Sequence, residues 1–70
     1  MDTYKKIKLY LDENGISQTW LSNKAGIPLP KLNLSLNGNR KIPLEEYELI
    51  CGALNVNTDK FLEKRIPVID

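Results

Sequence analysis

The chain has 70 residues, which is enough for one domain with a small hydrophobic core and too short for a separate catalytic or sensor domain. Its 41% hydrophobic and 27% charged residues are typical of a folded globular protein and exclude the composition of a disordered one. The net charge of +1 is unevenly distributed, because residues 1–43 carry seven bases and three acids, whereas residues 44–70 carry three bases and six acids. A basic first part is suited to an anionic partner.

The chain contains no histidine and a single cysteine, Cys51. We therefore expect no Ser–His or Cys–His nucleophile pair, no zinc site of the usual kind and no internal disulfide, and hence no enzyme, metal or cofactor. The sequence is polar from Asp2 onward and its apolar runs are short. We accordingly expect no signal peptide, no transmembrane helix and a cytoplasmic location.

The first half of the chain predicts three helices. Tyr4, Ile7 and Leu11 recur at helical spacing and indicate a helix over about residues 3–14, which Gly15 ends. Ser17 is a favourable N-cap for a second helix over about residues 18–25, which Gly26 ends. The third helix is expected to begin near Pro30 and to end at Asn37-Gly38, with an apolar face formed by Leu29, Leu32 and Leu36.

The second half predicts two more helices. Pro43 stands where a first helical residue is expected, and a helix to Leu54 follows it, with an inward stripe of Leu44, Tyr47, Ile50 or Cys51, and Leu54. Asn57 is a candidate cap for a short fifth helix that carries Phe61 and Leu62. The expected core also includes Leu21, Ala25, Leu32, Leu36, Leu49 and Cys51.

These elements predict an all-α fold of five helices in one domain over residues 1–64, followed by a C-terminal tail over residues 65–70. The tail contains Pro67 among apolar residues. Two readings stay open for it: a frayed end, or a short apolar strand that pairs with a partner.

Two short helices separated by a glycine turn, with the small Ser22 where the helices would have to approach closely, form a helix-turn-helix pattern. Beyond that pattern, the chain closely resembles the phage repressor and Cro-type family, also called the XRE family. The segments that carry the resemblance are Ser17-Gln18, Leu21-Ser22, Ala25-Gly26-Ile27, Lys31-Leu32-Asn33, Leu36-Asn37-Gly38-Asn39-Arg40-Lys41-Ile42, Glu45 to Leu49, Ala53-Leu54-Asn55-Val56 and Phe61-Leu62.

The resemblance implies a lambda-repressor-like domain that acts as a repressor or Cro-like regulator of phage or prophage type. Its third helix would enter the major groove of double-stranded operator DNA, and two copies would bind as a homodimer. No membrane and no small-molecule ligand is expected as a partner. The residues expected to contact DNA are Gln18, Thr19, Leu29, Pro30, Lys31, Asn33, Leu34, Asn37, Asn39, Arg40 and Lys41.

The start of the third helix departs from the family pattern, because Pro28, Leu29 and Pro30 replace the polar residues that relatives often carry there. With Leu34, these side chains suit contacts with thymine methyl groups or readout of DNA shape. Alternatively, they form an exposed apolar patch for another protein, which would make the chain an antirepressor or antitoxin-like partner. Trp20 also has two readings, packing on a neighbouring helix or contact with a protein.

Overall fold

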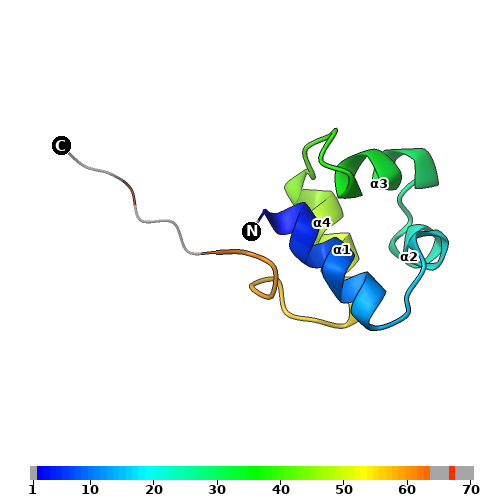
Figure 1. Ribbon diagram of the computed structural model, residues 1–70, viewed down its shortest axis with the longest axis horizontal. Coiled ribbons are helices and arrows are strands. Elements are labelled where there is room, and N and C mark those ends of the chain that lie inside the picture. Colours follow the sequence, from blue (N-terminus) through cyan, green and yellow to red (C-terminus); the bar gives the residue numbers. More distant parts are fainter. Residues whose placement is uncertain (1, 64–66, 68–70) are drawn as a thin grey trace.

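The computed structural model describes residues 2–63 and residue 67. Across these residues the chain forms four helices and no strand (Figure 1). The helices are α1 (Thr3–Glu13), α2 (Gln18–Ala25), α3 (Leu29–Leu36) and α4 (Leu44–Leu54). The expected all-α class is confirmed, whereas the expected fifth helix is absent from the described residues. The expected tail over residues 65–70 lies outside them, apart from Pro67.

Local signals in the sequence explain where the helices begin and end. The Ser17 hydroxyl accepts a hydrogen bond from the Trp20 N–H at 3.0 Å and so caps α2. Gly26 ends α2 in the left-handed conformation at φ 73°. Helix α3 begins at Leu29, one residue before the predicted start, because Pro30 in the first turn displaces no intrahelical hydrogen bond. Pro43 is the N-cap of α4 rather than its first helical residue.

The predicted fifth helix is replaced by turns over residues 58–61. The Lys60 N–H donates to the Asn57 carbonyl at 3.1 Å, and the Leu62 N–H donates to the Asp59 carbonyl at 3.4 Å. Each of these hydrogen bonds joins residues three apart, and they do not continue into the series of bonds between residues four apart that defines an α-helix. The segment is held by packing instead, because Phe61 is buried and meets the Tyr10 ring edge-on at 5.6 Å between centroids.

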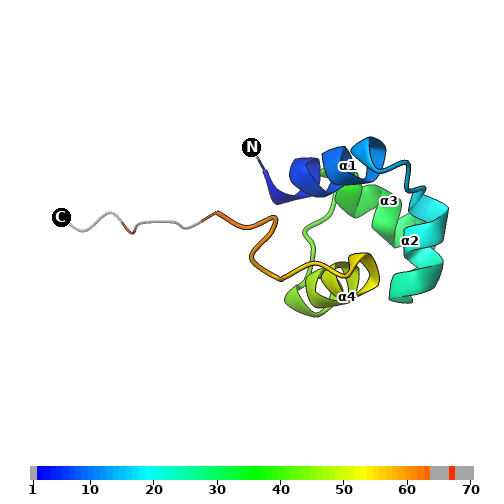
Figure 2. The same ribbon diagram turned by 90° about the horizontal axis from the view of Figure 1, so that it is seen from below.

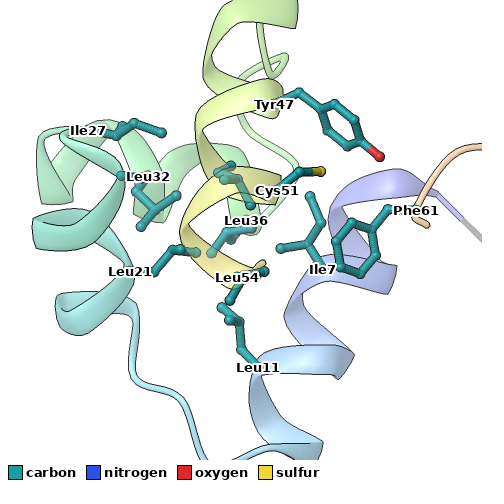
Figure 3. Close-up of a cluster of buried hydrophobic side chains, with 12 residues drawn as sticks. Ile7, Leu11, Leu21, Ile27, Leu32, Leu36, Tyr47, Cys51, Leu54 and Phe61 are labelled. Atoms are coloured by element: carbon teal, nitrogen blue, oxygen red, sulfur yellow. The ribbon is translucent and has the colours of Figure 1, made fainter. Parts of the chain in front are cut away.

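One hydrophobic core joins the four helices and the terminal turns (Figure 3). Its buried members are Ile7, Leu11, Leu21, Ala25, Ile27, Leu32, Leu36, Tyr47, Ile50, Cys51, Leu54 and Phe61. Two core predictions are wrong. Leu44 is 70% exposed and Leu49 is 50% exposed, because the covered side of α4 is the one that carries Tyr47, Ile50 and Leu54.

The helix arrangement leaves part of α3 uncovered. Helix α2 packs against both α3 and α4, and α1 packs against α3 (Figures 1 and 2). Helix α3 therefore rests on two neighbours while its remaining side faces solvent. None of the described helices is both long and apolar enough to cross a bilayer.

Candidate nucleic-acid interface

Helix α3 has one buried face and one exposed face. Leu32, Ser35 and Leu36 are buried at the spacing that places residues on the same side of a helix. Pro30, Lys31 and Leu34 are exposed, with Leu34 48% exposed, and Leu29 and Asn33 are half-buried at the edges. The predicted groove-facing residues therefore lie on the solvent side of α3 or on its borders.

The first turn of α2 carries the next two predicted contacts. Gln18 is half-buried and Thr19 is exposed, directly after the Ser17 cap. The first N–H groups of a helix carry partial positive charge and attract anions. The turn from α2 to α3 is fixed by the buried Ser22, whose hydroxyl donates to the Ile27 carbonyl at 2.6 Å. The sequence explained Ser22 by its small size, and the structure adds this hydrogen bond.

The connection from α3 to α4 forms hydrogen bonds with α1 and with the end of α3. The Asn37 side-chain carbonyl accepts a hydrogen bond from Lys8 Nζ of α1 at 3.2 Å. The Asn39 N–H donates to the Leu34 carbonyl at 2.9 Å, which closes the end of α3. Asn37, Asn39 and Lys41 are exposed. These three predicted phosphate contacts are accessible to a ligand.

Arg40 differs from its neighbours in the same connection, because its charge is already paired. Its guanidinium binds both oxygens of Glu46, at 2.7 and 2.8 Å, and also donates to the Ser35 hydroxyl at 3.1 Å. The hydrogen bond from Arg40 lowers the pKa of Glu46 and raises the pKa of Arg40. No pattern in the sequence connects Arg40 with Ser35 or Glu46.

The candidate interface lies in a part of the chain without acidic residues. No aspartate or glutamate occurs between residues 14 and 44, a span that contains α2, α3 and both flanking connections. The same span carries Lys24, Lys31, Arg40 and Lys41. Lys24, Lys31 and Lys41 are exposed and form no salt bridge within the described part of the chain. An acid-free run that carries four bases is suited to an anionic partner.

Glu46, in the first turn of α4, contacts this surface through Arg40. Its charge interacts with that of Lys31, which also lowers the Glu46 pKa. Both Glu46 oxygens accept hydrogen bonds from Arg40, and the Glu46 side chain is 21% exposed. Elsewhere among residues 2–63, no group of three or more Cys, Asp or Glu side chains is placed to hold a metal ion.

Comparisons with protein-family models, curated proteins and solved structures give no match to this chain.

Proposed function

We propose that the chain is a sequence-specific DNA-binding transcriptional regulator of the repressor or Cro-like kind, which inserts α3 into the major groove of an operator. The observation that carries the proposal is the outer face of α3, an exposed helical surface without acids inside a 31-residue acid-free span. A helix of about 10–12 Å diameter fits a major groove about 12 Å wide. The resemblance to the XRE family, with its lambda-repressor-like fold, supports the same function.

The contacts divide by chemistry. Lys41, Asn39 and Asn37 in the connection after α3, and Gln18 and Thr19 at the start of α2, are suited to phosphate oxygens. Their side chains and the α2 N–H groups carry positive charge or hydrogen-bond donors. They would supply affinity and orientation without reading the base sequence.

Base discrimination would come from the outer side of α3. The Asn33 amide can form paired hydrogen bonds with adenine, and Lys31 can donate to guanine. Leu29, Pro30 and Leu34 have no hydrogen-bonding side-chain groups and would contact thymine methyl groups. Since one short helix offers few such contacts, we propose that two copies bind half-sites about one helical turn apart.

Selection of bound sites from a random pool of duplex DNA tests the proposal. We expect one enriched sequence with an internal repeat, and salt-dependent binding to it in gel-shift measurements. Lys41→Gln should reduce the slope of log affinity against log salt by about one, because one phosphate contact is lost. Lys60→Gln is the matched control, because Lys60 lies over the Tyr10 ring outside the candidate interface. Absence of both enrichment and low-salt binding would refute the function.

A second candidate function, a protein-binding module such as an antirepressor or antitoxin-like partner, is favoured by two exposed apolar side chains. Leu34 is 48% exposed and Trp20 is 44% exposed on adjacent helices. In that case Leu34→Asp would abolish capture of a protein partner while the wild-type chain shows no shift of DNA at low salt. If Leu34→Asp instead changes only the preferred base sequence, the DNA-binding function is supported.

A further inference from the structure

The Arg40 side chain bridges two helices. Its Nη1 and Nη2 atoms donate to Oε1 and Oε2 of Glu46 at 2.7 and 2.8 Å, the paired geometry of an arginine–carboxylate fork. Nη1 also donates to the hydroxyl of Ser35 at 3.1 Å. Ser35 lies in the last turn of α3, and Glu46 lies in the first turn of α4. One guanidinium therefore joins the end of one helix to the start of the next.

This bridge acts where direct packing is weak. Helix α3 packs closely against α1 and α2, whereas α4 packs closely against α2 (Figure 2). Among the described residues, every side-chain hydrogen bond between α3 and α4 passes through Arg40. The guanidinium also reaches Ser35, which is only 2% exposed. Arg40 is half-buried and its guanidinium is held against Ser35 and Glu46, while the adjacent Lys41 is exposed.

We propose that Arg40 is a positioning residue of the DNA-binding surface: by joining Ser35 to Glu46 it fixes α3 relative to α4, and it makes no phosphate contact itself. The inference rests on the proposed DNA-binding function and replaces the role that the family resemblance gave to Arg40. The phosphate contacts of this connection then fall to Lys41 and Asn39.

The variant Glu46→Gln tests the proposal by the sign of its effect. Removing a negative charge beside a DNA-binding surface strengthens binding by electrostatics alone, and more so if it releases Arg40 toward a phosphate. If Arg40 positions α3, Glu46→Gln weakens binding instead. The glutamine amide has one acceptor oxygen and cannot accept both guanidinium hydrogen bonds, so the end of α3 becomes less firmly held. We expect a several-fold loss of operator affinity in Glu46→Gln. Glu48→Gln, an exposed acid of the same helix, measures the effect of charge removal alone.

Salt dependence separates the two roles of Arg40. If Arg40 only positions α3, Arg40→Gln weakens operator binding and leaves the slope of log affinity against log salt unchanged, whereas Lys41→Gln lowers the slope by about one. Arg40→Lys should behave like Arg40→Gln, because lysine keeps the charge but lacks the planar fork. A slope that falls by about one in Arg40→Gln, or tighter binding by Glu46→Gln, would overturn the proposal.

Hydrogen exchange tests the bridge without DNA. The Asn39 N–H donates to the Leu34 carbonyl at 2.9 Å at the end of α3, and we expect it to exchange several-fold faster in Arg40→Lys and in Glu46→Gln than in the wild type. Glu48→Gln should leave this rate unchanged. If the wild type binds no DNA, the proposed function fails, and faster Asn39 exchange still establishes the bridge. Unchanged exchange in both bridge variants overturns the inference whatever the DNA result.

Discussion

The tip of the Tyr4 ring lies against the backbone of Gly38, so closely that a Cβ atom on Gly38 would stand 2.6 Å from Tyr4 Cζ. Tyr4 belongs to the first turn of α1, and Gly38 follows the end of α3 with φ 80°. Glycine is required at this position for two reasons, its left-handed conformation and the absence of a side chain. The contact places α1 against the connection that carries the predicted phosphate contacts.

Gly38→Ala should lower the free energy of unfolding by about 2 kcal/mol, part from the left-handed backbone and part from displacement of the Tyr4 ring. Gly15→Ala is the matched control, because Gly15 has φ 64° and open space around a Cβ, and we expect it to cost about 1 kcal/mol. Urea unfolding of both variants, alone and combined with Tyr4→Ala, measures the coupling free energy between each glycine position and Tyr4. Equal losses at Gly38 and Gly15 would show that the ring yields without cost.

Ser17→Ala should destabilise the protein by about 1 kcal/mol, because the Trp20 N–H loses its acceptor at the start of α2. Ser17→Asp should retain most of the stability, since aspartate also caps and its charge favours a helix N-terminus. Thermal unfolding followed by circular dichroism compares the three chains. A loss in Ser17→Asp as large as that in Ser17→Ala would contradict the capping role.

Stability should fall in acid partly through Glu46. The hydrogen bond from Arg40 lowers the pKa of Glu46 in the folded state from its usual 4.5. The stabilisation that Glu46 provides is therefore complete above pH 4.5 and is lost as the pH falls through the lower, folded-state pKa. The urea midpoints of wild type and Glu46→Gln should differ at neutral pH and converge in acid. A constant difference between them across this range would argue against the ion pair as the cause.

Tyr47 should make the fold sensitive to alkali. Burial raises the pKa of Tyr47 to about 12 from 10.0, and its hydroxyl donates to the Thr58 carbonyl at 2.6 Å. Since the folded chain holds this proton more tightly, the stabilisation is complete below pH 10 and is lost as the pH rises towards 12. Tyr47→Phe should cost about 1 kcal/mol at neutral pH through the lost hydrogen bond. Between pH 10 and 12, the free energy of unfolding of Tyr47→Phe should then depend less on pH than that of the wild type or of Tyr10→Phe.

Most helix boundaries could be predicted from sequence because the signals that set them are local. Ser17 caps α2 through the backbone three residues ahead, and Gly26 ends α2 through its own φ angle. The terminal turns show the limit of this approach. Asn57 resembles a helix cap, but the segment after it is fixed by Phe61 against Tyr10 and by the Tyr47 hydroxyl, which belong to distant elements.

The candidate site divides in the same way. The sequence by itself determined that an acid-free segment would form two short helices, with Leu32 and Leu36 inward and Leu34 outward, because helical periodicity assigns faces. Only the tertiary structure decided that Leu44 and Leu49 stay exposed and that Arg40 turns toward Ser35 and Glu46. These outcomes depend on which helix covers which side, and a long charged side chain takes whichever partner the packing brings within reach.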